Sequence, residues 1–232
     1  LRSNDLNMPE EINRIITDSI TDYFFVTEES GVTNLLNEGK KKSDIFFVGN
    51  LMIDNLFYGL NKIKKRKSKI NKDYGIITLH RPSNVDNPKK LGEIISALKE
   101  ISKEIHLLFS IHPRTKNSIS NFKIKLGNNI SILEPQSYLN FLHLMRDAKV
   151  IFTDSGGIQE EATILKIPCY TLRKNTERPI TISLGTNELM PFNPELILQK
   201  VEKNEFKSGE VPELWDGKAT NRAIEIMKTY IK

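Results

Sequence analysis

The sequence predicts an α/β protein built on a parallel sheet with helices on both faces. Short, continuous apolar segments alternate with segments of helical periodicity from residue 44 to residue 172, which is the pattern of strands buried on both faces. Polar residues follow several of these strands directly, where ligands bind in such sheets. With 232 residues, of which 38% are hydrophobic and 27% charged, the chain can form one domain or slightly more.

The first elements come before a basic segment at 62–72. Pro9, with Glu10 and Glu11 in the first turn, predicts the start of a helix, because proline and acids suit a helix N-terminus. A helix so soon after Leu1, which is not Met, suggests a piece of a longer protein. The early elements are a helix at 9–20, an apolar segment at 22–27, a helix at 28–38 ended by Gly39, a strand at 44–48 and a helix through 52–60.

The same alternation repeats after the basic segment. The connections between parallel strands should be right-handed. After residue 172 the pattern loosens into a loop at 174–190, a helix near 193–203 and a last helix at about 218–231. The predicted strands are 74–79, 106–111, 129–133, 149–153 and 168–172, with helices near 88–103, 115–126, 137–147 and 157–166.

Composition and charge disfavour several classes of protein. The formal net charge is +5, and the excess lies in Lys40–Lys42 and the segment 62–72. Because no aromatic residues are interleaved there, these are interpreted as solvated linkers rather than nucleic-acid sites. One cysteine, Cys169, excludes a disulfide framework and a cysteine zinc site. No apolar run approaches the roughly 20 residues of a membrane span. We therefore expect a cytoplasmic protein without nucleic-acid or membrane partners.

Polar residues gather after four of the predicted strands. Since the carboxyl ends of parallel strands meet at one edge of the sheet, these residues should form one site for an anion. They are His80 and Arg81, His112 and Arg114, the turn Asp154–Gly157, and Arg173 with Thr176–Arg178.

The turn Ser155-Gly156-Gly157 lies between a predicted strand and a predicted helix. Its glycines let backbone N–H groups approach a ligand, and the helix N-terminus adds partial positive charge, which suits a phosphate or diphosphate. Glu161, one turn later, is placed to accept a hydrogen bond from a ribose hydroxyl. An ordinary turn capped by a side chain stays open as the alternative. Neither a strict dinucleotide fingerprint nor a P-loop is present, so NAD and ATP are not favoured.

The other candidates also have structural alternatives. His80 and His112 suit an anion site with one imidazole for acid–base chemistry, or they are packing residues. A metal held by both histidines and Asp154 is disfavoured. Arg178 is either a clamp for phosphate or half of an Arg–Glu pair, and Phe141 either packs on a base or belongs to the core.

Together, these motifs resemble the UDP-N-acetylglucosamine 2-epimerase family of the non-hydrolysing type. The most specific feature is DSGGIQEEA followed at this distance by TERP. The resemblance implies a GT-B-like architecture of two Rossmann-like halves with a nucleotide sugar between them. Residues 1–48 would then be the tail of the N-terminal domain, and 49–232 the C-terminal domain, with the last helix packing back toward the absent part. The matching segments are PEEINR (9–14), FVGNLMID (47–54), TLHRPSNVD (78–86), IHPRT (111–115), DSGGIQEEA (154–162), LRKNTERP (172–179), GTNEL (185–189) and LWDGKA (214–219).

The resemblance also implies roles for single residues. The sequence departs from the family pattern at two places, which affect local loop shape more than chemistry. Ser83 stands where the family often has Glu, and Met190-Pro191 stands where a Val-Gly type ending is usual. Arg114 is a further candidate for substrate binding because it follows a strand. The implied roles are catalysis for His80 and Glu10, diphosphate contacts for Ser155, Gly156, Gly157 and Arg178, a ribose contact for Glu161, a uracil-side contact for Phe141, and contact with a second, activating substrate in some bacterial relatives for Glu10, Arg81 and His112.

The implied activity interconverts UDP-GlcNAc and UDP-ManNAc for cell-surface polysaccharide synthesis. The proton at C2 is removed while UDP leaves C1, and UDP then adds back after protonation on the other face. No cofactor or metal is implied, and the full-length family member is expected to be a homodimer. Because most acidic catalytic residues belong to the absent half, we expect this chain alone to be inactive. The alternatives are a hydrolysing epimerase, a UDP-binding module inactive without an N-terminal half, and a retaining glycosyltransferase of GT-B fold.

Overall fold

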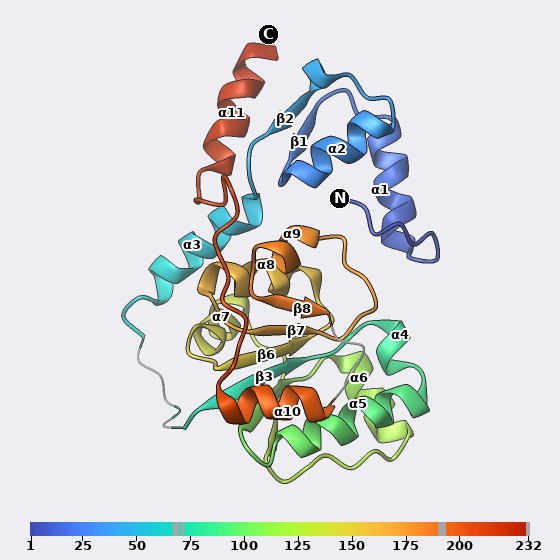
Figure 1. Ribbon diagram of the computed structural model, residues 1–232, viewed down its shortest axis with the longest axis vertical. Helices are drawn as coiled ribbons and strands as arrows, with labels where there is room; N and C mark the ends of the chain where they lie inside the picture. The colour runs from blue at the N-terminus through green and yellow to red at the C-terminus, as the bar shows by residue number, and fades with distance from the viewer. Residues whose placement is uncertain (67–69, 71, 190–193, 231–232) are drawn as a thin grey trace.

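The computed structural model describes residues 1–66, 70, 72–189 and 194–230. The elements lie in two groups along the long axis of the molecule (Figure 1). The larger group is built on a six-stranded sheet, and the smaller group on a two-stranded sheet. Among the described residues, no helix is long and apolar enough to cross a membrane.

The six strands are all parallel and lie in the order β5-β4-β3-β6-β7-β8. The chain starts in the middle at β3, moves outward to β5, returns to β6 and continues to the other edge. The direction therefore reverses between β3 and β6, which makes their carboxyl ends the switch point of a doubly wound sheet. The predicted fold class is confirmed. The strands are β3 (Tyr74–Thr78), β4 (His106–Ser110), β5 (Ile130–Leu133), β6 (Val150–Thr153), β7 (Cys169–Thr171) and β8 (Asn187–Leu189).

Three elements of the large group were not predicted from the sequence, and one of them is the short helix at Pro179–Ser183 in the segment 174–190 that was expected to be a loop. The edge strand β8 lies in the same segment, and it pairs with β7 through Cys169 and Asn187. It has only three residues and no apolar run, so it carries none of the usual strand pattern. The short helix α4 (Pro82–Val85) lies in another expected loop. The departure at Met190-Pro191 lies outside the described residues.

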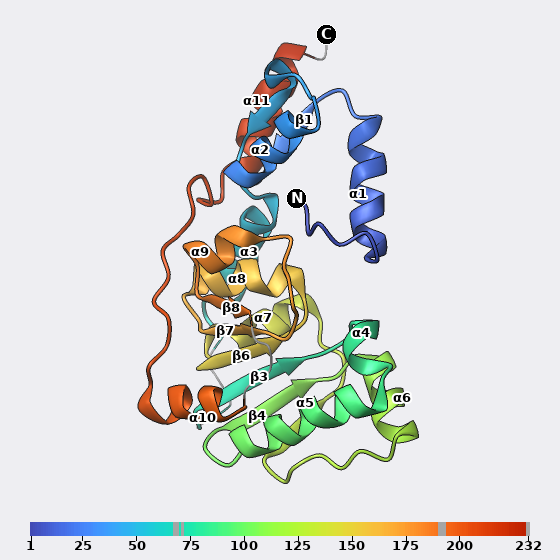
Figure 2. The ribbon, with the colours of Figure 1, turned by 45° about the vertical axis from the view of Figure 1, so that its right-hand side comes forward.

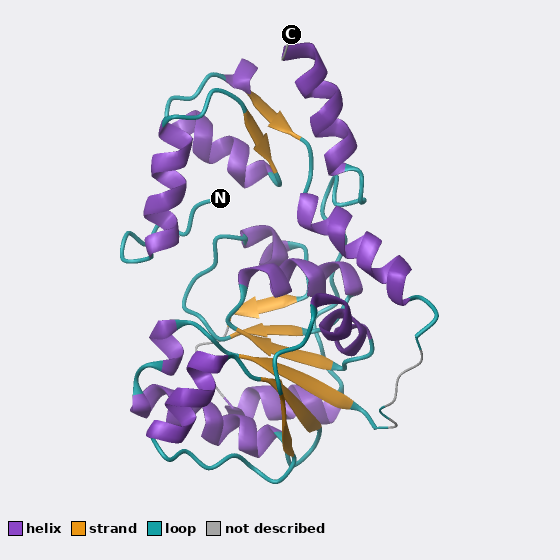
Figure 3. Ribbon diagram, turned by 180° about the vertical axis from the view of Figure 1, so that it is seen from behind, coloured by secondary structure: helices purple, strands orange, loops and turns teal. Residues whose placement is uncertain are grey.

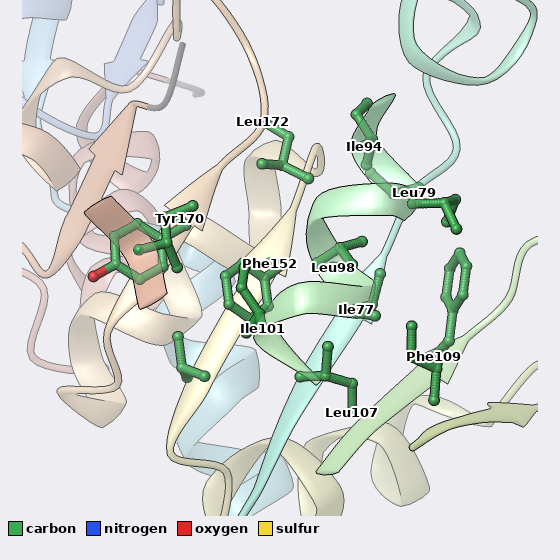
Figure 4. Close-up of a cluster of buried hydrophobic side chains, with 14 of the residues drawn as sticks. Ile77, Leu79, Ile94, Leu98, Ile101, Leu107, Phe109, Phe152, Tyr170 and Leu172 are labelled. Atoms are coloured by element: carbon green, nitrogen blue, oxygen red, sulfur yellow. The ribbon is translucent and has the colours of Figure 1, made fainter. Parts of the chain in front are cut away.

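Helices cover both faces of the sheet (Figure 2). Neighbouring residues of a strand point to opposite faces, so Ile77 belongs to the core under α5 and Ile76 to the core under α3, α7 and α8. Figure 4 shows the first of these cores, where Leu98 of α5 lies near Ile77 and Phe152. The helices are α3 (Leu51–Ile63), α5 (Pro88–Ile101), α6 (Pro113–Asn121), α7 (Tyr138–Arg146), α8 (Gly156–Leu165), α9 (Pro179–Ser183) and α10 (Pro194–Lys203).

The helix expected at 115–126 has different ends in the structure. The helix α6 begins at Pro113, a good first residue, and ends at Asn121, two residues before Lys123 adopts a positive φ of 54°. The other predicted helices of this group agree with the structure within about three residues.

The smaller group contains a parallel pair of short strands over a small core of Phe24, Val26 and Leu35. The last helix, α11, lies beside these strands (Figure 3), and the ring of Tyr230 is 5.2 Å from that of Phe46. The elements are α1 (Pro9–Ser19), β1 (Phe24–Val26), α2 (Glu29–Asn37), the 3₁₀ helix η1 (Lys42–Asp44), β2 (Ile45–Phe47) and α11 (Ala219–Tyr230).

The chain crosses between the two groups twice, and the crossings touch. Gly49 has a φ of 87°, and a Cβ there would lie 2.0 Å from the carbonyl oxygen of Leu214. Only glycine permits this conformation and this approach. The indole nitrogen of buried Trp215 donates to the carbonyl oxygen of Thr27 at 2.9 Å. The returning segment is therefore fixed to both groups.

Candidate functional site

The predicted polar residues meet at the carboxyl ends of β3 and β6. A cavity of about 220 Å³ opens there. The rings of His80 and His112 lie on it with their centroids 5.9 Å apart. Ser155 and Ile158, at the start of α8, also line it. Ligands bind beyond the carboxyl ends of parallel strands, and this strand-end rule therefore brings three of the sequence candidates to one cavity.

His80 is held by a buried carboxylate. Its Nδ1 lies 2.8 Å from Oδ1 of Asp154, a residue with no exposed surface. The same carboxylate accepts hydrogen bonds from the backbone N–H of Arg81 at 2.9 Å and from the side chain of Asn84 at 3.2 Å. Burial opposes ionisation, but the hydrogen bond with the His80 ring and those from the backbone N–H groups of Arg81 and His80 hold the pKa of Asp154 below its ordinary value. The sequence placed Asp154 in the polar turn, with a cap or a metal ligand as its possible roles, and did not predict its pairing with His80.

The glycine turn leaves the start of α8 open. Ser155 stands at the N-cap position, yet its side chain makes no capping hydrogen bond. The ordinary capped turn that the sequence left open is therefore not what the structure has. The unsatisfied N–H groups of the first turn and the helix dipole favour an anion at this end.

Arg178 lies directly against this turn. A Cβ at Gly156 would be 2.3 Å from its Nη1 and 2.7 Å from its Cζ. Its Nε is 3.0 Å from Oε1 of Glu160, and its Nη1 hydrogen-bonds Glu177. Arg178 thus forms Arg–Glu pairs and also places a guanidinium beside the helix N-terminus.

Glu177 is surrounded by four guanidinium groups. Arg173 donates to it at 2.8 Å, Arg178 is bonded to it, and Arg14 and Arg81 come within 3.7 and 3.8 Å. Burial acts to raise the pKa of Glu177, but the hydrogen bond from Arg173 and the nearby charges lower it to about 2. One carboxylate therefore gathers several arginines next to the glycine turn. Sequence reasoning missed Arg14 altogether.

The helix α1 brings two acids toward this cluster, and they differ. Glu10 is exposed, and its carboxylate is 3.7 Å from Nη1 of Arg81. Glu11 is buried, accepts from the backbone and hydroxyl of Ser3, and pairs with Arg14 at 2.6 Å. Burial opposes ionisation, but those hydrogen bonds lower the pKa of Glu11. Glu11 is thus a structural acid, whereas Glu10 is free to face a ligand.

Glu161 and Phe141 lie on neighbouring helices. Glu161, on α8, is 5% exposed and accepts a hydrogen bond from the Tyr138 hydroxyl at 3.0 Å. Burial raises the pKa of Glu161 to about 7. Phe141, on α7, is half-buried and packs against the core beneath α8. The structure therefore places Phe141 at the margin of the core rather than inside it.

Arg114 is engaged away from the glycine turn. It forms a two-bond ion pair with Asp86, at 2.8 and 2.5 Å, and both side chains are exposed. Its backbone N–H donates to Nδ1 of His112 at 3.2 Å, which caps α6. In the described part of the chain, no group of three or more His, Cys, Asp and Glu side chains could hold a metal ion.

A doubly wound sheet with an open glycine turn and arginines near its switch point is typical of Rossmann-like proteins that bind nucleotides. The chain belongs to the UDP-N-acetylglucosamine 2-epimerase family, because the family model described by that name matches residues 1–228.

Individual relatives agree with this assignment. A UDP-N-acetylglucosamine 2-epimerase of Methanocaldococcus jannaschii is 44% identical over 100% of this chain and 67% of its own length. A crystal structure of UDP-GlcNAc 2-epimerase from that organism, in complex with UDP-GlcNAc and UDP, has a TM-score of 0.90 at 42% identity, covering 99% of this chain and 67% of that one. The Neisseria meningitidis enzyme bound to UDP-GlcNAc has a TM-score of 0.86 at 29% identity, covering 99% and 68%. The present chain thus spans about two thirds of the length of these GT-B-like relatives.

Proposed function

We propose that this chain is the UDP-binding part of an epimerase that interconverts UDP-GlcNAc and UDP-ManNAc. The observation that carries the proposal is the uncapped start of α8, with the Arg178 guanidinium lying against Gly156. The similarity to an epimerase in complex with UDP-GlcNAc and UDP supports the choice of ligand.

The diphosphate of UDP would lie at the Ser155-Gly156-Gly157 turn. There it would accept hydrogen bonds from the free backbone N–H groups and from Arg178, whose position is fixed by Glu177. Elimination of UDP from C1 of the sugar develops negative charge on this diphosphate. Donors that are already oriented stabilise that charge without reorganisation in the transition state.

The nucleoside would lie over the first turns of α7 and α8. Glu161 is placed to accept from the ribose hydroxyls, and Phe141 to contact the uracil. The Tyr138 hydroxyl, which donates to Glu161 at 3.0 Å, would hold the carboxylate in position.

The sugar would lie between His80 and Glu10. His80 lines the cavity at the sheet edge, and Glu10 approaches from α1 beside Arg81. Epimerisation at C2 needs a base on one face and an acid on the other. Part of this chemistry belongs to the N-terminal half, of which residues 1–48 would be the tail, and the chain alone is expected to be inactive. The homodimer and the cytoplasmic location implied by the resemblance belong to this proposal.

Calorimetric titration with UDP tests the proposal. Arg178→Ala should weaken binding about 10- to 150-fold, because hydrogen bonds to charged groups contribute about 1.5–3 kcal/mol each. The control is Arg146→Ala. Arg146 is the last residue of α7 and pairs with Asp147, just before β6, so it lies at the edge of the sheet opposite the proposed site. Equal affinities of wild type and Arg178→Ala would contradict the proposed diphosphate site.

A further inference from the structure

We propose that Asp154 is a positioning residue for His80, holding its imidazole as the tautomer with hydrogen on Nδ1 and leaving Nε2 free to exchange a proton with the substrate. The chemistry that His80 performs rests on the proposed function. The positioning itself is a property of this chain and can be measured without a substrate.

The hydrogen-bond inventory of Asp154 determines the tautomer. Its carboxylate accepts from the backbone N–H of His80 at 3.1 Å, from that of Arg81 at 2.9 Å and from Asn84 at 3.2 Å. An ionised carboxylate has no hydrogen to donate. The 2.8 Å contact between Nδ1 of His80 and Oδ1 of Asp154 therefore requires the hydrogen to be on Nδ1. The depressed pKa of Asp154 supports the ionised form.

The sheet fixes this geometry before any ligand arrives. Thr78 and Thr153 are partners in the β3–β6 ladder, and their hydroxyls hydrogen-bond at 2.7 Å. Asp154 is the next residue after Thr153, and His80 is two residues after Thr78. Asn84 also donates to the carbonyl oxygen of Leu172 beyond β7, at 2.9 Å. The carboxylate is thus buried among the ends of three neighbouring strands.

This arrangement serves proton transfer. The His80 side chain is 41% exposed and lines the cavity, so the ring edge that Asp154 does not hold is open. A proton taken from the substrate would bind to the lone pair of Nε2, and the positive charge formed on the ring would face the Asp154 carboxylate. A histidine oriented by a second group in this way is ready for catalysis in a single tautomer.

Asp154→Asn tests the proposal because the amide keeps the shape but adds a donor. The N–H groups of Arg81 and Asn84 both point at Oδ2, and the backbone N–H of His80 lies 3.1 Å from each carboxylate oxygen, so an amide oxygen at the Oδ2 position satisfies all three donors. The amide NH₂ then faces Nδ1 of His80, which can bond to it only as an acceptor. The hydrogen of the neutral ring is expected to move to Nε2.

The measurement is a long-range proton–nitrogen NMR correlation on protein with ¹⁵N-labelled histidine, at about pH 8.5, where an ordinary histidine is neutral. The chain has four histidines, and His80→Gln identifies the resonances of His80. We expect hydrogen on Nδ1 in the wild type and on Nε2 in Asp154→Asn. Hydrogen on Nε2 in the wild type would overturn the proposal even if the variant did not fold, and so would the same tautomer in both proteins.

Asn84→Ala is the matched control for a merely structural role. It removes one hydrogen bond to Oδ2 of Asp154 and one to Leu172, but leaves the contact with Nδ1 of His80 intact. Its stability should fall while the hydrogen of His80 stays on Nδ1, and a tautomer change in this variant would count against the proposal. UDP titration of the wild type separates the two proposals: absence of binding would contradict the proposed function and leave the tautomer result standing.

Discussion

Replacing Gly156 with alanine should damage UDP binding while leaving the fold intact. The new Cβ would lie 2.3 Å from Nη1 of Arg178, whereas an ordinary contact needs at least 3.4 Å. The guanidinium therefore has to move by about 1 Å, which is enough to break a hydrogen bond of normal length. The Cβ would also lie 2.9 Å from Oε1 of Glu177. Because both obstacles are the ends of flexible side chains, the backbone of α8 can stay in place.

The expected magnitudes differ for binding and for stability. Losing one or two charge-assisted hydrogen bonds to the diphosphate should raise the Kd for UDP about 10- to 150-fold. The free energy of unfolding should fall by about 1–3 kcal/mol, since moving the Arg178 guanidinium weakens its ion pairs with the buried acids Glu177 and Glu160. Calorimetry with UDP and urea unfolding measure the two quantities separately.

A second glycine provides the control. Gly92 lies inside α5, and a Cβ there would meet no atom within 4 Å. Gly92→Ala should therefore raise the free energy of unfolding by about 0.5–1 kcal/mol and leave UDP affinity unchanged. If Gly156→Ala binds UDP within twofold of the wild type, the contact between Arg178 and the glycine turn does not serve the diphosphate, and the reasoning is refuted.

Three further substitutions test the electrostatics and the capping. Burial raises the pKa of Glu161 to about 7 from an ordinary 4.5, so the wild type loses stability as pH rises from 4.5 to 7. Glu161→Gln should avoid this loss and be more stable than the wild type at pH 7 by about 3 kcal/mol in urea unfolding. If the stabilities of the two proteins changed in parallel with pH, the prediction would be wrong. The pKa of Glu177 is lowered to about 2, so the stabilisation by its charge is present above pH 4.5 and lost toward pH 2. Glu177→Gln should lower the free energy of unfolding by about 3 kcal/mol at pH 7 and by progressively less in acid. A loss that did not depend on pH would exclude the charge as its cause. The Asp54 carboxylate accepts from the backbone N–H groups of Ala219 and Thr220 at 3.1 and 2.7 Å; Asp54→Ala should cost about 1 kcal/mol and speed hydrogen exchange at both amides, and unchanged exchange there would show that this cap is dispensable.

The larger part of the fold was predictable because its strands are short, continuous and apolar. The pattern at 149–153, for example, corresponds to β6, whose four residues are all buried. The strand β8 was not predicted because an edge strand of three residues needs no apolar run. Its Asn187 is buried through side-chain hydrogen bonds with Thr171 and Gln159 instead. Such polar burial depends on tertiary neighbours, which a reading of local pattern does not contain.

The location of the site could be predicted from the sequence, but most of its side-chain contacts could not. The strand-end rule selects His80, Ser155 and Arg178 because it needs only the ends of parallel strands. The partnership of Asp154 with His80 needs the strand order as well, since β3 and β6 are distant in sequence and adjacent only in the sheet. Arg114 follows the same rule as His80, yet its side chain pairs with Asp86 on the surface. The rule thus places a backbone position and does not determine where a long side chain points.

The net charge illustrates why the electrostatics of the site cannot be predicted without the structure. The sequence locates the excess of +5 in two basic segments outside the site. At the site, arginines are instead balanced by buried acids: Glu177 gathers four guanidinium groups, and Glu160 pairs with Arg178. A bound diphosphate would therefore meet guanidinium groups that are already oriented and partly neutralised, in a site whose donors are fixed by their acid partners. The number of arginines alone would predict a strong non-specific attraction for anions, whereas the pairing favours a ligand that matches the positions in which Glu177 and Glu160 hold Arg178.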